Sequence, residues 1–255
     1  MNLKSFLYDT AEGAGNILLK HYGRLRHIEK KEGAGIVTEA DKNAERYIMK
    51  KIFSKFKNSS IITEESGEFE GDSPFLWIID PLDGTSNYAH GFPWFCVSIG
   101  VYVEGKPAFG VIYHPILKEM FFAARGKGAT LNNRPIRVSK ETKLEDSLVG
   151  TGFYYSKAKE LRDEMGIFSR MNEHCLAVRR PGSAALDLAQ VACGRYDGFW
   201  ERGLSPWDVA AGFLIVEEAG GKISNYSGKT TTPFEKQVIA SNGLLHKKMV
   251  NAIHG

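Results

Sequence analysis

Residues 77–93 read Trp-Ile-Ile-Asp-Pro-Leu-Asp-Gly-Thr-Ser-Asn-Tyr-Ala-His-Gly-Phe-Pro. The apolar run before Asp80 predicts a short buried strand, and Asp83, Gly84 and Thr85 follow it in one tight turn. Crowded carboxylates repel one another, and divalent metal ions neutralise them while leaving their oxygens available for chemistry. The alternative is an ordinary turn, because Asp-Gly is common in turns and Asp or Thr can cap a helix.

Two further acidic segments favour a site over an ordinary turn. Ile61–Glu64 is a second apolar run that ends in an acid, and Glu65 follows it directly. Asp208 lies at the start of an apolar segment that predicts a helix. Each acid lies where an element begins or ends, which is where sites are commonly built. Oxygen ligands without histidine or cysteine indicate magnesium, or manganese in its place.

Composition excludes several classes of protein. The 255-residue chain is 43% hydrophobic and 25% charged, as expected for a globular protein with a large core. A net charge of +3 is too small to argue for nucleic acid. We find no apolar run of membrane length and no signal peptide, so we expect a cytoplasmic protein without membrane contact. The three cysteines are widely spaced, which indicates reduced core residues: Cys96, Cys175 and Cys193.

The first half predicts two helices followed by a sheet. Apolar residues at three-to-four spacing indicate a helix over 2–22, and Thr38 with Asp41 resembles a capping box that starts a second helix. A hairpin turn at Glu104-Gly105 makes its neighbouring strands antiparallel. Strands are expected at 60–63, 75–79, 95–103, 107–113 and 119–124.

The second half alternates strands and helices, which indicates a layered α/β unit. A topological boundary near 135–145 divides the chain into subregions 1–140 and 141–255, which we expect to form one continuous compact unit. The strands are expected near 147–151, 176–179, 197–201, 222–224 and 236–240, and the helices near 157–172, 183–193, 207–219 and 243–253.

Three segments together resemble the inositol monophosphatase family of metal-dependent, lithium-sensitive phosphatases. They are Trp77–Pro93, with Asn87 and His90, then Arg180–Asp187, then Trp207–Gly212 running on to Glu218-Ala-Gly-Gly. The resemblance covers nearly the whole chain. It implies an α-β-α-β-α five-layer sandwich, with an antiparallel sheet in the first half and a mixed or parallel sheet in the second.

The resemblance also implies a metal site of two or three Mg²⁺ ions, for which Mn²⁺ can substitute. Carried over by position, Glu64, Asp80 and the carbonyl of Leu82 bind the first metal. Asp80 bridges to the second metal, which Asp83 and Asp208 also bind. A weaker third metal would lie near Glu64.

The same comparison assigns the catalytic groups. Glu64 and Thr85 orient the attacking water, and Asp41 accepts a hydrogen bond from the Thr85 hydroxyl. The backbone N–H groups of Gly84 and Thr85 offer a seat for phosphate at a helix start. Glu65 is the rival of Glu64, since spacing alone cannot choose between neighbours.

Substrate contacts follow from the same resemblance. Glu201 matches the acid that binds ring hydroxyls, and Gly182, Ser183 and Ala184 match the segment beside the ring, with Asp208 at its border. Glu201 could instead be an exposed acid at a strand end, and Ser183 could be a helix cap, with or without a ligand role.

Other expectations concern the surroundings of the site. Lys30 matches a loop lysine near the third metal, or it is a solvated charge. Trp77, Trp94 and Trp207 are expected in the core. The connection Gly67–Phe75 is shorter than the corresponding loop of the animal enzymes. This shortening should open the pocket and relax specificity for inositol.

We therefore predict a magnesium-dependent phosphomonoesterase that acts on inositol 1-phosphate or similar small polyol phosphates, as a homodimer. The nearest alternatives are fructose-1,6-bisphosphatase, alone or as a dual activity, adenosine 3′,5′-bisphosphate phosphatase and histidinol-phosphate phosphatase. An alternative of another class is a module that binds RNA or the transcription machinery. Four arginines could supply charge for a second phosphate: Arg179, Arg180, Arg195 and Arg202.

Overall fold

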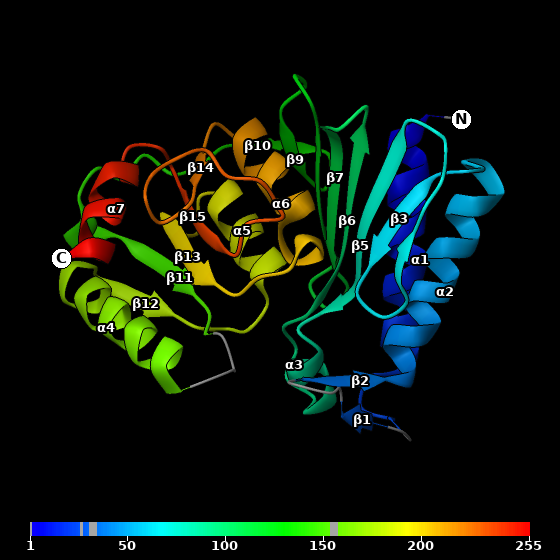
Figure 1. Ribbon diagram of the computed structural model, residues 1–255, viewed down its shortest axis with the longest axis horizontal. Coiled ribbons are helices and arrows are strands. Elements are labelled where there is room, and N and C mark those ends of the chain that lie inside the picture. Colours follow the sequence, from blue (N-terminus) through cyan, green and yellow to red (C-terminus); the bar gives the residue numbers. More distant parts are fainter. Residues whose placement is uncertain (1, 26–27, 31–34, 154–157) are drawn as a thin grey trace.

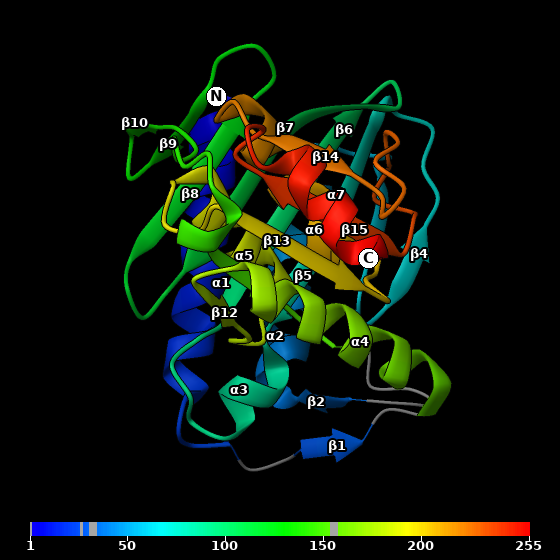
Figure 2. The same ribbon diagram turned by 90° about the vertical axis from the view of Figure 1, so that its left-hand side faces the viewer.

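The computed structural model describes residues 2–25, 28–30, 35–153 and 158–255, and they form five layers (Figure 1). Helices α1 and α2 cover the outer face of the first sheet, α5 and α6 lie between the two sheets, and α4 and α7 cover the second sheet. Figure 2, turned by 90°, shows α4 and α7 in front of that second sheet. The five-layer fold predicted above is confirmed. The helices are α1 (Leu3–His21), α2 (Glu39–Lys55), α4 (Ala158–His174), α5 (Ala184–Ala192), α6 (Pro206–Glu218) and α7 (His246–His254).

The first sheet has eight strands in the order β10-β9-β8-β7-β6-β5-β3-β4. All neighbours are antiparallel except β3 and β5, which are parallel. The short strand β4, which was not predicted, pairs with the outer edge of β3 and returns the chain so that β5 enters in the direction of β3. The strands are β3 (Ser60–Thr63), β4 (Gly67–Phe69), β5 (Phe75–Asp83), β6 (Cys96–Val103), β7 (Lys106–His114), β8 (Glu119–Ala124), β9 (Ala129–Leu131) and β10 (Arg134–Ile136).

The second sheet is mixed, as expected, with five strands in the order β12-β11-β13-β15-β14. Strand β11 is parallel to both its neighbours, whereas β15 is antiparallel to β13 and β14. The strands are β11 (Leu148–Thr151), β12 (Ala177–Arg179), β13 (Gly198–Arg202), β14 (Lys222–Ser224) and β15 (Gln237–Ser241). Four short elements complete the described chain: β1 (Ile28–Lys30), β2 (Ile36–Thr38), α3 (Thr85–Ala89) and a 3₁₀ helix, η1 (Leu144–Asp146).

Local sequence signals explain where several elements begin. The capping box of Thr38 and Asp41 starts α2, as predicted. The turn between β6 and β7 holds Glu104 and Gly105 at φ of 52° and 73°, the left-handed pair that a two-residue hairpin requires.

The central helix α6 lies unusually close to the first sheet. A Cβ at Gly100 would lie 2.9 Å from the Cβ of Ala210, and one at Gly110 would lie 2.6 Å from the carbonyl oxygen of Ala211. Only glycine permits this approach, because a side chain at either position would push the helix away. The packing holds the start of α6, with Asp208, against the end of β5. Within the described residues, no helix is both long enough and apolar enough to cross a membrane.

Candidate active site

Three of the predicted acids meet where β5 ends and α6 begins. Asp80, Asp83 and Asp208 each offer a carboxylate oxygen, and these oxygens all lie within 4.8 Å of one another. Asp83 and Asp208 line a cavity of about 290 Å³, while Asp80 is buried beside them. The cavity also contains every other predicted substrate contact, since its lining includes Gly84, Thr85, Gly182, Ser183, Ala184 and Glu201.

Strand β5 runs farther than predicted. We expected it to end at Ile79, but it continues through Pro81 to Asp83, with an irregular register against β6 between Asp80 and Asp83. Proline has no N–H for the ladder, and a bulge accommodates it there. The irregularity lets the N–H of Leu82 turn back to Asp80, whose carboxylate accepts it at 2.9 Å.

Each of four acids is oriented by a backbone N–H group. This pattern fixes carboxylates that would otherwise rotate, and such hydrogen bonds to a charged acceptor are among the stronger ones in proteins. The donors are Leu82 N to Asp80 at 2.9 Å, Ala185 N to Asp83 at 2.7 Å, Ser205 N to Asp208 at 2.7 Å and Thr38 N to Asp41 at 2.8 Å.

The crowded acids raise one another's pKa. Burial, followed by the charges of Glu64, Asp83 and Asp208, raises the pKa of Asp80 well above its ordinary range. Burial also raises the pKa of Asp83 to about 6, although hydrogen bonds from Ser183 and Ala185 oppose the shift. Such a cluster favours bound cations, and its oxygen donors fit Mg²⁺ or Mn²⁺.

Glu64 and Glu65 face different spaces. Glu64 lines the cavity with Asp83 and Asp208, and its charge contributes to the raised pKa of Asp80. It lies outside the three-acid cluster defined above. Glu65 lines a separate groove beside α2, together with Lys42 and others.

Thr85 lies between two acceptors. Its hydroxyl is 3.0 Å from the carbonyl oxygen of Leu82 and 3.3 Å from Oδ1 of Asp41. Burial raises the pKa of Asp41 to about 6. Gly84, just before Thr85, has φ of 94°, and a Cβ there would lie 2.8 Å from the carbonyl oxygen of Trp94, so the turn requires glycine.

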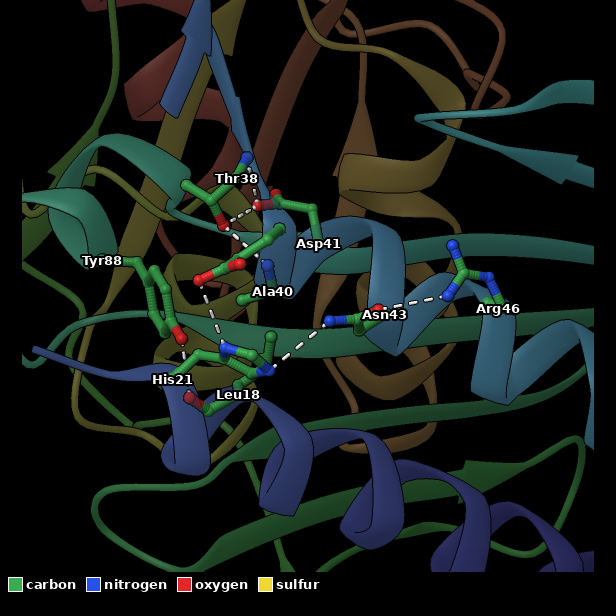
Figure 3. A network of polar contacts seen from close by, with 9 residues as sticks. Leu18, His21, Thr38, Ala40, Asp41, Asn43, Arg46 and Tyr88 are labelled. Atoms are coloured by element: carbon green, nitrogen blue, oxygen red, sulfur yellow. Dashed lines mark hydrogen bonds and ion pairs between the residues drawn. The ribbon is translucent and has the colours of Figure 1, made fainter. Parts of the chain in front are cut away.

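A network of polar contacts joins α1, α2 and α3 next to Asp41 (Figure 3). Tyr88 of α3 donates its hydroxyl hydrogen bond to the carbonyl of Leu18 in α1 at 2.6 Å. The side chains of Asn43 and His21 are 3.4 Å apart and join α2 to α1. These contacts tie three helices together around Asp41, which is fully buried.

Ser183 caps a helix and also lines the cavity, so its two interpretations, as a cap and as a residue of the site, are compatible. Its side chain accepts a hydrogen bond from Leu186 N, so it caps α5. Its hydroxyl also donates to Asp83 at 2.6 Å, and the residue lines the cavity. Asn87 joins the same segment to α3, because its amide donates to the carbonyl of Pro181 at 2.8 Å.

Glu201 is not a solvent-facing acid at a strand end, so that alternative is wrong. It is partly buried, and a Cβ at Gly152 would lie 2.1 Å from its carboxylate. Burial and the charges of Asp208 and Asp83 raise its pKa well above the ordinary range, while Arg180 opposes the shift.

Some residues were missed or misplaced by sequence reasoning. Trp207 was expected in the core but is partly exposed and lines the cavity, because it is on the first turn of α6. Asp187 is buried behind the cavity, where burial and then Glu201 raise its pKa. Its signal in the sequence is an acid within the mostly apolar run of α5, whose other polar residue is Gln190. Glu45, a buried acid of α2, was also missed.

The four arginines separate into two groups. Arg180 and Arg202 line the cavity, and Arg202 forms an ion pair with Glu164 at 3.2 Å. Arg195 instead pairs with Glu119 through its two terminal guanidinium nitrogens, at 2.8 and 2.6 Å.

The described cavity lining does not include Arg179 or any residue of Gly67–Phe75. The short connection therefore does not border the cavity. The side chain of Lys30 lies outside the described residues.

Known proteins are similar to this chain in sequence and fold. Residues 2–255 match the inositol monophosphatase family. The chain is 45% identical over 242 residues to inositol-1-monophosphatase of Synechocystis sp., covering 94% of this chain and 84% of that protein. It is 42% identical over 243 residues to Nus factor SuhB of Escherichia coli (strain K12), covering 94% and 91%.

Two further likenesses agree. The chain is 41% identical over 242 residues to fructose-1,6-bisphosphatase/inositol-1-monophosphatase of Thermotoga maritima, covering 94% of this chain and 91% of that protein. The structure of the extragenic suppressor protein suhB from Bartonella henselae superposes with a TM-score of 0.95 at 38% identity, covering 98% of each chain. The chain therefore belongs to the inositol monophosphatase family.

Proposed function

We propose that this protein is a magnesium-dependent phosphomonoesterase that hydrolyses inositol 1-phosphate or a related small polyol or sugar phosphate. The observation that carries the proposal is the cluster of Asp80, Asp83 and Asp208, whose oxygens lie within 4.8 Å of one another. Asp83 and Asp208 also border a cavity shared with Glu201. Three acids held this close have no structural benefit by themselves, because their repulsion costs stability unless cations are bound.

The residues would divide between two or three metal ions. Glu64, Asp80 and the carbonyl of Leu82 would hold the first ion, and Asp80, Asp83 and Asp208 the second. A third would bind weakly near Glu64. Bound magnesium supplies polarisation of the phosphate ester and stabilisation of the charge on the leaving alkoxide.

The protein's own groups would orient the attacking water. A hydroxyl has one proton, so Thr85 donates it to Asp41 or to the Leu82 carbonyl and keeps lone pairs that accept a hydrogen bond from water. Glu64 would accept the second hydrogen bond of that water. The N–H groups of Gly84 and Thr85 would bind phosphate oxygens. These positions hold the water and the phosphorus in line, which removes an entropic cost from the reaction.

Glu201 would select substrates that carry hydroxyls. It lies on β13 and lines the same cavity as Thr85, so its carboxylate would be available to ring hydroxyls of a bound polyol. A hydrogen bond to a charged group contributes about 1.5–3 kcal/mol. Gly182, Ser183 and Ala184 would form the wall beside the ring.

A second candidate is activity toward fructose 1,6-bisphosphate. Arg180 and Arg202 both line the cavity, so a second phosphate would meet Arg180 there and would compete with Glu164 for Arg202. The name of the Thermotoga maritima relative supports the same possibility for this chain. Arg195 is excluded from this role because it is not part of the described cavity lining and pairs with Glu119.

The proposal extends to the cellular location and the oligomeric state of the protein. Three free cysteines fit a reducing compartment, so we propose a cytoplasmic enzyme. The homodimer and the inhibition by lithium are proposed from family membership, and sedimentation and lithium titration test them.

A phosphate-release panel tests the proposed function. Inositol 1-phosphate, fructose 1,6-bisphosphate, adenosine 3′,5′-bisphosphate and histidinol phosphate should be compared with Mg²⁺ and with chelator. We expect magnesium-dependent release, fastest for a polyol or sugar phosphate. Arg180→Met should lower kcat/KM for the bisphosphate more than for inositol 1-phosphate if both are substrates. Release from none of them would favour a module that binds RNA or the transcription machinery, as the name of the Escherichia coli relative suggests for that protein.

A further inference from the structure

A buried carboxylate on α2 fastens the turn that carries Glu64. Glu45 lies one helical turn after Asp41 and is only 3% exposed. It accepts hydrogen bonds from the hydroxyl of Thr63 at 2.7 Å, from Glu65 N at 3.0 Å and from Ser66 N at 3.4 Å. It also accepts one from the hydroxyl of Ser66. One acid of α2 thus holds residues on both sides of Glu64.

The fastened segment is a tight turn between two strands. Thr63 of β3 pairs with Gly67 of β4, so the turn between them consists of residues 64–66. Within it, Glu64 lines the cavity of the acid cluster, whereas Glu65 lines the groove on the side of α2. The direction of each side chain is therefore set by how this short turn is held.

The hydrogen bond from Glu65 N matters most. This N–H belongs to the peptide that follows Glu64, so its orientation fixes the backbone on the carboxyl side of Glu64. Short turns of polar residues have conformational freedom of their own. Hydrogen bonds to an ionised acceptor are shorter and stronger than those between neutral groups. Several such bonds to one carboxylate restrict the turn to a single conformation.

We propose that Glu45 is a positioning residue, whose carboxylate fixes residues 63–66 so that Glu64, and not Glu65, faces the metal ions and the attacking water. This inference rests on the proposed role of Glu64. It assigns Glu45 no contact with substrate or metal. Partners that orient metal ligands commonly contribute 10- to 100-fold to metal affinity.

The chain offers a matched control. Glu218, at the end of α6, accepts the N–H groups of Gly126 at 2.6 Å and Gly128 at 2.7 Å, so it fastens the turn between β8 and β9. It is a glutamate on a helix that holds a hairpin turn, like Glu45, but it lies outside the cavity lining. Removing either side chain should lower the melting temperature.

The test measures Mn²⁺ binding by electron paramagnetic resonance, together with kcat and KM. Glu45→Ala should weaken Mn²⁺ binding by about 10- to 100-fold. It should also lower kcat at saturating metal about tenfold or more, with KM changed less than about threefold. Glu45→Gln keeps the size and an acceptor oxygen, so it should restore both values to within about threefold of the wild type. Glu218→Ala should leave metal binding and kcat unchanged.

A double-mutant cycle separates positioning from general stability. In a Glu64→Gln background, Glu45→Ala should lower neither metal binding nor kcat further, because Glu45 acts only through Glu64. A loss that multiplies in that background would overturn the inference, and so would wild-type metal affinity in Glu45→Ala. If Glu45→Ala does not fold, Thr63→Val with Ser66→Ala removes the hydroxyl donors and should weaken Mn²⁺ binding in the same direction; unchanged binding would overturn the inference.

Measurements on the wild-type protein distinguish failure of the inference about Glu45 from failure of the proposed function. A wild-type protein that binds Mn²⁺ and releases phosphate, beside a Glu45→Ala variant that does both equally well, overturns only the inference. A wild-type protein that binds no Mn²⁺ and releases no phosphate overturns the proposed function and the inference with it.

Discussion

Ser183 donates a hydrogen bond to Asp83 at 2.6 Å, although the two residues lie 100 positions apart in the chain. The N–H of Ala185 reaches the same carboxylate oxygen at 2.7 Å. Asp83 ends a strand of the first sheet, and Ser183 begins the helix that lies between the sheets. The orientation of a candidate metal ligand therefore depends on the packing of the second half of the chain against the first.

Ser183→Ala should damage both stability and metal binding. Loss of a helix cap costs about 0.5–2 kcal/mol of unfolding free energy. Loss of the hydrogen bond to Asp83 should raise the Mg²⁺ concentration for half-maximal activity by roughly tenfold. Asn2→Ala is the control, because Asn2 caps α1 by accepting the N–H of Lys4 at 3.0 Å, far from the cavity. Urea denaturation and magnesium titration of both variants decide the matter: an unchanged magnesium requirement in Ser183→Ala would show that the hydrogen bond has no role in the site.

Glu64→Gln should lower kcat by on the order of 10²–10⁴, with a smaller effect on KM, because it acts on the attacking water. Glu65→Gln should change kcat by less than about threefold, since Glu65 lines the groove beside α2 instead of the cavity. Steady-state kinetics at saturating Mg²⁺ compares the two variants directly. Equal losses would mean that the choice between these neighbours is wrong.

Magnesium should stabilise the protein more at pH 8 than at pH 5. The pKa of Asp83 is raised to about 6, so the metal-free folded protein holds a proton that the unfolded chain has released. The unfolding free energy of the metal-free protein therefore falls as pH rises from about 4 to 6 because of this group. At pH 5 magnesium must displace that proton, which weakens its binding about tenfold per carboxylate.

The comparison must be made with and without metal at each pH. Burial lowers the pKa of His114 and His246 to about 4, so these residues make the protein less stable as pH falls below their ordinary value of 6.5. That contribution has the opposite sign to that of Asp83, but it cancels in the difference that magnesium makes. Thermal melts in chelator and in excess Mg²⁺ give this difference. An equal shift at both pH values would contradict the linkage.

Glu201→Gln should reduce kcat/KM for inositol 1-phosphate by roughly 10- to 100-fold, because it weakens hydrogen bonds worth about 1.5–3 kcal/mol. The ester p-nitrophenyl phosphate has no polyol hydroxyls, so its hydrolysis should change little. Parallel assays of both substrates separate Glu201 from the metal ligands, whose loss should affect every substrate alike. A common factor for both substrates would place Glu201 in the support of the metals or of the fold.

Sequence patterns predicted the long elements because those elements carry their own signals. The capping box of Thr38 and Asp41 and the Glu104-Gly105 hairpin are formed by residues that are close in the sequence, so a short stretch of sequence is enough to predict them. Strand β4 was missed because its residues are mostly exposed and its only support is pairing with β3. Helix α3 was expected only as a helix start at Gly84 and Thr85, because its five residues carry too short a pattern to predict its extent.

The residues of the site also differ in whether the local sequence reveals them. Asp80 and Asp83 could be singled out because they follow an apolar run. Glu45 could not, because its role depends on Thr63 and Ser66, which reach it only after β3 has packed beside α2. The position of Trp207 at the cavity also depends on tertiary packing, since an aromatic residue on an apolar helix gives the same pattern in a core.

The most direct test of the metal-dependent mechanism is phosphate release from inositol 1-phosphate while Mg²⁺ is titrated into chelator-treated protein, for the wild type and for Asp83→Asn. The exposed acid Asp72, changed to Asn, is the control. We predict no release without metal, saturable release by the wild type and the control, and near-complete loss in Asp83→Asn with the fold intact, because one ligand is gone. Full activity of the wild type in chelator, or of Asp83→Asn at the wild-type Mg²⁺ concentration, would contradict the account.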